Sequence, residues 1–153
     1  MTLLARLRRS LKRRLLATLS VYPPYLGAGI RVKRVAKGHF RVSMGLHWYN
    51  RNYFGTHFGG SLYSMCDPFF VLALMEHLGS AFEAWDKRST IHFRRPGRGR
   101  VTAEFAIPAE RVEQIRREAL ERGTTEAEFE VEVLGPEGEV VARVEKLVHV
   151  RAR

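Results

Sequence analysis

An aspartate stands in the middle of the most apolar stretch of the chain. Asp67 lies within residues 62–78, and it follows the pair Gly59-Gly60 by seven positions. A carboxylate among apolar neighbours has to be paired, hydrogen-bonded or protonated, because burying an unpaired charge is costly. Such a carboxylate can act as a general base or a nucleophile. The free backbone N–H groups of a helix that starts with glycine can hold an oxyanion, so these residues together could attack and polarise a carbonyl group.

Each of these residues also has a structural interpretation. Asp67 precedes Pro68, and Asp-Pro is a good N-cap and first-turn pair, so the carboxylate could cap the second half of a kinked helix. Gly59-Gly60 could form a tight turn packed against a sheet. Cys66 is typical of a small core residue, because nothing nearby in the sequence would lower the pKa of its thiol.

The elements that would position these residues follow from the alternation of apolar and polar side chains. Alternation predicts strands at about residues 30–36, 40–46, 90–96, 101–107, 129–133 and 140–150. A helix from about Gly60 to Leu78 is apolar nearly all round, so we expect it to be the buried central element. Pro108 opens a short amphipathic helix that Gly123 closes. The order indicates an α+β domain in which an antiparallel sheet wraps around one long central helix.

The formal charge of +10 is concentrated at the N-terminus. Residues 1–37 hold ten of the 26 lysines and arginines and no acidic residue, so the other 16 balance the 16 acidic residues of the rest. Residues 3–19 place leucines on one helical stripe, with basic residues largely opposite. We therefore expect a basic amphipathic helix over residues 1–22 and a single domain over residues 23–153. Residues 1–20 could contact an anionic membrane surface, or dock on the sheet or on a neighbouring subunit.

Composition and patterning argue against several classes of protein. One cysteine rules out an internal disulfide framework and fits a reducing compartment. The longest uninterrupted apolar run, residues 69–75, is far too short to span a bilayer, and residues 1–20 lack the apolar core of a cleavable signal. Nucleic-acid binding is not expected, because the basic helix lacks a helix-turn-helix partner and interleaved aromatic residues. The histidines show no metal-ligand spacing, so no metal is expected. We expect a cytoplasmic protein.

One segment carries a specific signature. Residues 55–62 read Gly-Thr-His-Phe-Gly-Gly-Ser-Leu, and Asp67-Pro68 follows. This combination, with the order of elements, resembles the hotdog-fold acyl-CoA thioesterase superfamily, and most closely an uncharacterised bacterial thioesterase-like subgroup with a Gly-Thr-X-Phe-Gly-Gly-Ser-Leu signature. The resemblance covers about residues 23–151. It implies a hotdog fold and a thioesterase of the acyl-CoA hydrolase type, acting on a thioester of coenzyme A or an acyl carrier protein.

The resemblance also assigns roles to residues. In phenylacetyl-CoA-type thioesterases of this fold, a His-Gly-Gly opens the helix and a carboxylate follows the histidine by nine positions. Aligned on Gly59 and Gly60, Phe58 takes the histidine position and Asp67 takes the carboxylate position. Asp67 is therefore expected to be the general base or nucleophile, with the glycine amides polarising the carbonyl. The acyl chain in these folds is usually held between two subunits, so the resemblance implies a homodimer or tetramer with residues of the partner's loop near Asp67.

Five further residues are candidates for substrate binding: Asn52, Thr56, His57, Arg94 and Arg95. The amide and hydroxyl side chains could equally cap or make a turn. The arginines could grip the phosphates of coenzyme A or belong to a solvated turn. No cofactor is expected beyond the coenzyme A of the substrate.

Two other functions stay open at this point. A hotdog dehydratase or hydratase could pair His57 with Asp67, because dehydration needs two groups near one substrate carbon. A non-catalytic acyl-binding protein associated with a membrane could keep the fold without turnover. The first requires the two side chains to lie close together in the oligomer, and the second predicts ligand binding without product.

Overall fold

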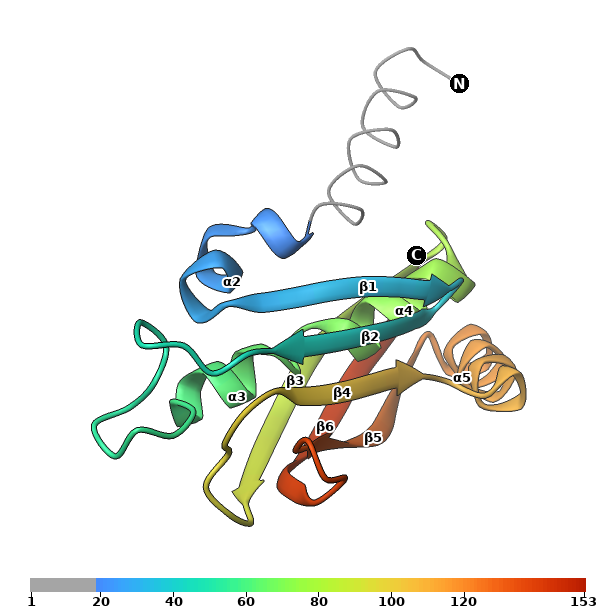
Figure 1. The fold of residues 1–153 in the computed structure, drawn as a ribbon. Helices are drawn as coiled ribbons and strands as arrows, with labels where there is room; N and C mark the ends of the chain where they lie inside the picture. The colour runs from blue at the N-terminus through green and yellow to red at the C-terminus, as the bar shows by residue number, and fades with distance from the viewer. Residues whose placement is uncertain (1–18) are drawn as a thin grey trace.

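A six-stranded antiparallel sheet is the main element of the molecule (Figure 1). The computed structural model describes residues 19–153. The strands lie in the order β1-β2-β4-β5-β6-β3, so β1 and β3 form the two edges. The strands are β1 (Ile30–Ala36), β2 (His39–Met44), β3 (Phe82–Phe93), β4 (Val101–Ala106), β5 (Thr124–Leu134) and β6 (Val140–Ala152). The helices are η1 (Leu19–Val21), α2 (Pro23–Ala28), α3 (Gly59–Ser64), α4 (Phe69–Leu78) and α5 (Ala109–Arg122).

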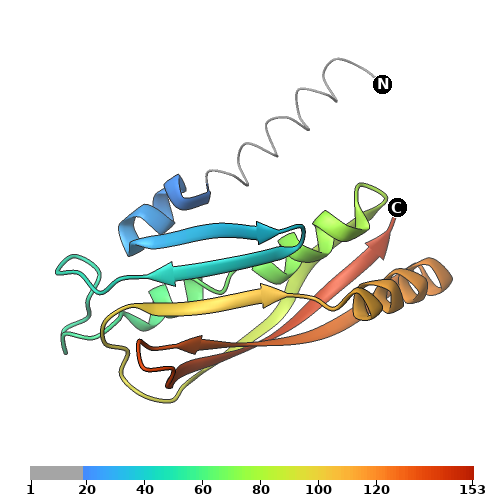
Figure 2. The same cartoon turned by 45° about the vertical axis from the view of Figure 1, so that its right-hand side comes forward.

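The sheet curves around the central helical segment formed by α3 and α4, as Figure 2 shows from a second side. The core lies between α4 and the inner face of the sheet, where aromatic rings pack together. The ring centre of Phe69 lies 5.0 Å from that of Phe105 and 5.8 Å from that of Phe40. Phe70 stacks on Phe129 with the two ring centres 4.8 Å apart. The predicted wrapping of an antiparallel sheet around a central helical segment is therefore confirmed.

The central segment is not one continuous helix, which corrects the expectation of an unbroken helix from Gly60 to Leu78. α3 ends at Ser64 and α4 begins at Phe69, and the Asp67-Pro68 peptide bond between them is cis. Proline has no N–H to donate, and it disfavours the helical conformation for the residue before it. The residues between the two helices therefore leave the helical ladder, and Asp67 lies at the break.

Three other differences have local causes. β3 begins at Phe82, well before the predicted residue 90. The prediction missed the first half of the strand because a register shift between Asp86 and Arg88 breaks the alternation of apolar and polar residues. The strand ends at Phe93, not at Pro96. α2 was not predicted, although prolines fit the first turn of a helix. The predicted helix over residues 1–22 falls mostly on residues 1–18, which lie outside the described residues.

The remaining helix agrees with its prediction. α5 follows Pro108 and ends at Arg122, directly before Gly123, which adopts a φ of 79°. Its predicted apolar face, Val112, Ile115 and Ala119, is buried. In residues 19–153, no helix is both long enough and apolar enough to cross a membrane.

Candidate functional site

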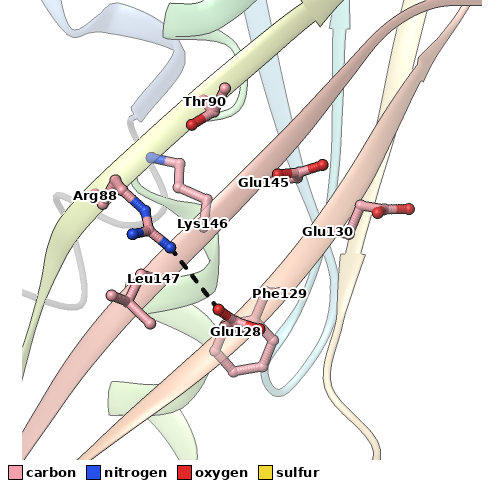
Figure 3. A pocket seen from close by; sticks show the side chains of 8 residues that line it. All are labelled: Arg88, Thr90, Glu128, Phe129, Glu130, Glu145, Lys146 and Leu147. Atoms are coloured by element: carbon pink, nitrogen blue, oxygen red, sulfur yellow. Dashed lines mark ion pairs between the residues drawn. The ribbon is translucent and has the colours of Figure 1, made fainter.

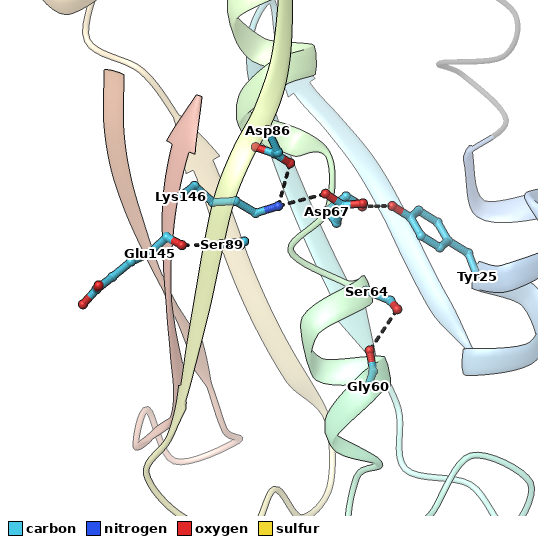
Figure 4. Close-up of polar contacts among 8 residues, drawn as sticks. All are labelled: Tyr25, Gly60, Ser64, Asp67, Asp86, Ser89, Glu145 and Lys146. Carbon is cyan, nitrogen blue, oxygen red and sulfur yellow. Dashed lines mark hydrogen bonds and ion pairs between the residues drawn. The ribbon is translucent and has the colours of Figure 1, made fainter. Parts of the chain in front are cut away.

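A buried lysine joins Asp67 to a second aspartate (Figure 4). The Nζ atom of Lys146 lies 2.8 Å from Oδ1 of Asp67 and 2.7 Å from Oδ2 of Asp86. The three residues come from the break between α3 and α4, from β6 and from β3. The side chain of Lys146 is 1% exposed, whereas that of Asp67 is 45% exposed. The Asp67 carboxylate is thus held from the interior and open on another side.

The alternation of β6 directs the side chain of Lys146 into the interior. Val144, Val148 and Val150 are buried on the inner face of the strand, and Lys146 occupies the same face. The register shift in β3 lies next to Asp86, at a point where a bulge can redirect a side chain. The ammonium group also lies 5.1 Å from the ring centre of Tyr63, a cation–π contact.

Asp67 does not cap α4, so the capping interpretation does not describe this structure. The N-cap of α4 is Pro68, and no side chain makes a capping hydrogen bond there. The carboxylate of Asp67 is paired with Lys146 instead. The backbone carbonyl of Asp67 accepts a hydrogen bond from the hydroxyl of Tyr25 on α2. Backbone and side chain of Asp67 are therefore held by different elements.

The two carboxyl groups of this cluster have different proton affinities. Burial alone would raise the pKa of Asp67, but the hydrogen bonds with Asp86 and Lys146 outweigh it, and the net pKa is lowered. Burial and the neighbouring Asp67 raise the pKa of Asp86. Burial lowers the pKa of Lys146, but its two aspartate partners more than compensate and raise it. Lys146 therefore stays cationic, Asp67 stays ionised, and Asp86 takes up a proton first.

A separate cavity of about 660 Å³ collects the residues predicted to bind substrate. All five of them line it, together with Gly59, from the β2–α3 and β3–β4 connections: Asn52, Thr56, His57, Arg94 and Arg95. Asp67 does not line this cavity. Gly60 lines another cavity, of about 400 Å³, on the side of α2. Within one chain the predicted residues therefore fall into separate groups.

Two of these side chains hold the loops in place. The amide of Asn52 donates to the hydroxyl of Thr56 at 3.0 Å, and its oxygen accepts from the backbone N–H of Thr56 at 3.1 Å. Nε2 of His57 lies 2.8 Å from the carbonyl oxygen of Gly99. The N–H of His57 donates to the carbonyl of Gly97 at 3.1 Å, which ties the two connections together. Burial lowers the pKa of His57, so its imidazole is neutral at neutral pH.

The start of α3 leaves two amides outside the helical ladder. The N–H groups of Ser61 and Leu62 both donate to the carbonyl of Phe58, at 3.0 and 3.1 Å. Gly59 and Gly60 are the first two residues of the helix, so their N–H groups have no partner within it, and no side chain caps this end. Phe58 is the N-cap and is 57% exposed. The position that holds a histidine in the phenylacetyl-CoA-type pattern thus holds an exposed phenyl ring here.

A third cavity, of about 270 Å³, lies over β3, β5 and β6 (Figure 3). Its charged lining includes Arg88 and Glu128, whose closest atoms are 3.9 Å apart, and Glu130 and Glu145. Lys146 also borders it, but its ammonium group turns to the other face of the sheet, where it meets Asp67. This cavity is therefore separate from the aspartate pair. Within residues 19–153, no group of three His, Cys, Asp or Glu side chains is placed to hold a metal ion.

Cys66 is a buried core residue beside Asp67. Burial raises the pKa of its thiol to about 12. We predict that a thiol reagent fails to label the native protein and labels one thiol per chain after unfolding in guanidinium chloride, because only a thiolate in contact with solvent reacts. Ellman's reagent measures both states. Rapid labelling of the native protein would contradict the burial of Cys66.

Comparison with known proteins gives the family. The family model described as "Domain of unknown function (DUF4442)" matches residues 12–150. The chain belongs to this family. No curated protein sequence matches the chain. The DUF4442 match includes the whole of the sheet except its last residues, together with Asp67, Asp86 and Lys146.

Several solved structures are similar to this DUF4442 chain. One is a Pseudomonas aeruginosa protein described as "Protein of Unknown Function PA5026 … Probable Thioesterase", with 28% identity, a TM-score of 0.79, and coverage of 95% of this chain and 96% of that one. The Escherichia coli PaaI protein from the phenylacetic acid degradation operon has 21% identity, a TM-score of 0.64, and coverage of 90% and 89%. A Haemophilus influenzae thioesterase has 16% identity, a TM-score of 0.67, and coverage of 90% and 88%.

These similarities, with the order of the strands, confirm the predicted α+β hotdog fold. The DUF4442 chain thus shares the hotdog fold with proteins that are named thioesterases. The narrower subgroup defined by the Gly-Thr-X-Phe-Gly-Gly-Ser-Leu signature stays a prediction. We did not predict a role for Lys146 from the sequence. The signal was present, because Val144 and Val148 lie two residues away on either side, and a lysine in such a valine pattern indicates an unusual buried charge.

Proposed function

We propose that the protein hydrolyses an acyl thioester of coenzyme A or of an acyl carrier protein. Asp67 acts as general base or nucleophile, and the amides of Gly59 and Gly60 polarise the thioester carbonyl. The observation that carries the proposal is a half-exposed carboxylate at the helix break that is paired with a buried lysine. The same contact lowers the pKa of Asp67, which favours the ionised form that a base or nucleophile needs. The carboxylate lies in a fold shared with proteins that are named thioesterases.

The chemistry can proceed in two ways. As a general base, Asp67 takes a proton from water while the water oxygen attacks the carbonyl carbon. The C–S bond then breaks, and the leaving thiolate receives that proton. As a nucleophile, Asp67 forms a mixed anhydride and expels the thiolate, and water then hydrolyses the anhydride. In both, negative charge develops on the carbonyl oxygen, where backbone N–H donors stabilise it.

The proposed active site combines two subunits. Gly59 lines a cavity that Asp67 does not line, so one subunit alone does not bring the two groups to a common space. The second edge of β3 is unpaired within residues 19–153, and Asp86 lies on this strand. A free strand edge is a template for pairing with another chain. A homodimer would place the loop of a partner against the exposed side of Asp67, with the acyl thioester between the subunits.

The cavity at Gly59 is proposed to receive the coenzyme A part of the substrate. Arg94 and Arg95 form no salt bridge with any residue of the described range 19–153, so they can meet phosphate groups. Asn52, Thr56 and His57 line the same cavity and hold its walls. No cofactor is proposed.

The dehydratase alternative receives no support from the position of His57. Nε2 of its ring lies 2.8 Å from the carbonyl oxygen of Gly99, and Nδ1 is buried away from solvent, so neither ring nitrogen is open to a substrate. Acid–base work on one substrate carbon requires both groups within hydrogen-bonding reach of that carbon. Hydrolysis requires only Asp67 and the backbone amides.

The experiment that tests the function is an assay with a panel of acyl-CoA substrates of different chain lengths. Release of free coenzyme A thiol is followed with a chromogenic thiol reagent. Because burial keeps Cys66 unreactive, the native enzyme contributes little to the signal. We expect thiol release with at least one acyl chain, in proportion to enzyme concentration. Binding of acyl-CoA without thiol release from any member would support the non-catalytic alternative instead.

A further inference from the structure

We infer that Lys146 is a positioning residue for the Asp67 carboxylate, and that Asp86 is the second anchor that holds Lys146 in place. This inference rests on the proposed function, because it assigns a role to residues around the proposed reactive group. Figure 4 shows the ammonium group between the two carboxylates, with Asp67 at the break between α3 and α4.

Burying the charged group of Lys146 costs free energy, because the ammonium group is removed from water. The residue occupies a place in the buried valine face of β6, and its side chain is 1% exposed. Replacing a buried ion pair with apolar residues of similar volume is often neutral or stabilising. An apolar residue would continue the face of β6 without any desolvated charge. A cation at this position is explained if it orients the exposed carboxylate of Asp67 that it contacts.

The geometry restricts the Asp67 carboxylate. Lys146 binds Oδ1, and almost half of the Asp67 side chain stays exposed. The contact fixes the rotation of the carboxylate from the interior, because Lys146 itself is held by Asp86 and by the ring of Tyr63. A reacting group that is fixed in one orientation needs less ordering when substrate binds.

Charge is the second part of the role. Within residues 19–153, the charged or titratable groups around Asp67 and its lysine partner are Tyr25 from α2, Tyr63 from α3 (which contacts Lys146), the adjacent Cys66, Asp86 from β3 and Lys146 from β6. Lys146 is the one cation of this set. Removing it leaves two neighbouring carboxyl groups that share a proton, so the ionised form of Asp67 would be lost at a higher pH.

The test compares Lys146→Met with Lys37→Met, the same substitution at an exposed lysine in the turn between β1 and β2. We expect Lys146→Met to lower kcat for the best acyl-CoA by up to about 100-fold, with a small change in KM. The acid limb of its pH–rate profile should move to higher pH. Lys146→Arg should recover part of kcat and of the profile. Lys37→Met should match the wild type in both.

Two further measurements keep the inference testable. Asp86→Asn should lower kcat less than Lys146→Met does, because Lys146 loses one anchor and keeps Asp67. Carbon-13 NMR titration of the Asp67 carboxyl, assigned with Asp67→Asn, should show ionisation at lower pH in the wild type than in Lys146→Met. If Lys146→Met does not fold, Lys146→Gln takes its place. This titration separates the inference from the proposed function, because it does not require turnover.

A folded Lys146→Met protein with unchanged kcat, an unchanged pH–rate profile and an unchanged Asp67 titration would make Lys146 a structural residue only. Absence of hydrolysis by the wild type, with the expected difference in the titration, would overturn the proposed function and leave the electrostatic role of Lys146 in place.

Discussion

Replacing Asp67 with asparagine is expected to lower kcat for acyl thioester hydrolysis by about 100- to 10,000-fold, the range of a general base. Asparagine has nearly the same shape, so the substitution removes the charge and the ability to accept a proton while keeping an oxygen for Lys146. The binding of acyl-CoA should persist, because Asp67 does not line the cavity with Arg94 and Arg95. Thiol release measures kcat, and calorimetric titration measures binding.

The fold of the Asp67→Asn variant should survive. Lys146 keeps its ion pair with Asp86, so the buried ammonium group is not left without a carboxylate. Glu145→Gln is the matched control, since Glu145 precedes Lys146 on β6 and lines the cavity on the other face of the sheet. That variant should hydrolyse substrate at the wild-type rate. Full activity in a folded Asp67→Asn protein would remove Asp67 from the mechanism.

Replacing Gly59 with proline is expected to lower kcat by about 100- to 1,000-fold, the loss typical of one missing oxyanion donor. Gly59 is the first residue of α3, where proline is well tolerated because the N–H has no partner in the helix. Phe58 has φ −68° and ψ 129°, a conformation suited to the residue before a proline. The substitution therefore deletes one amide proton with little change to the helix.

Gly59→Ala is the control for the added atoms. A Cβ at this position would lie 3.0 Å from Cζ of Phe93, whose side chain is largely exposed and can move. The alanine variant carries that Cβ and keeps the N–H, so it should retain most of the activity. The ratio of kcat between the two variants measures the contribution of the amide. Equal rates in the alanine and proline variants would exclude the Gly59 amide as an oxyanion donor.

The fold was largely predictable because its strands alternate cleanly and its turns are marked by glycine and proline. The inner residues of β4 alternate with outer ones over its whole length, and α5 presents a simple apolar face. The pattern failed where the backbone departs from a regular period. The bulge next to Asp86 breaks the alternation in the first half of β3, so that half was not predicted. Pro68 interrupts the central segment, which was predicted as one helix.

The candidate site was predicted in part. Asp67 was found because a single charge in an apolar segment is visible in the sequence. Lys146, 79 residues later, was missed because its partnership with Asp67 depends on how β6 lies beneath the helix break. The cavity at Gly59 depends on contacts between two connections, such as that of His57 with Gly99. The residues that line this cavity were candidates one by one, but the sequence did not predict that the cavity is separate from Asp67.

A single-turnover reaction, with enzyme in excess over one acyl-CoA, measures directly whether Asp67 takes part in hydrolysis. Quenched samples are separated by chromatography, and acyl-CoA, free coenzyme A and the carboxylic acid are each quantified. We expect wild-type protein to convert the thioester to equal amounts of acid and coenzyme A, and Asp67→Asn to bind the acyl-CoA and leave it intact. Recovery of unchanged acyl-CoA from the wild type, or equal conversion by the two proteins, would contradict this expectation.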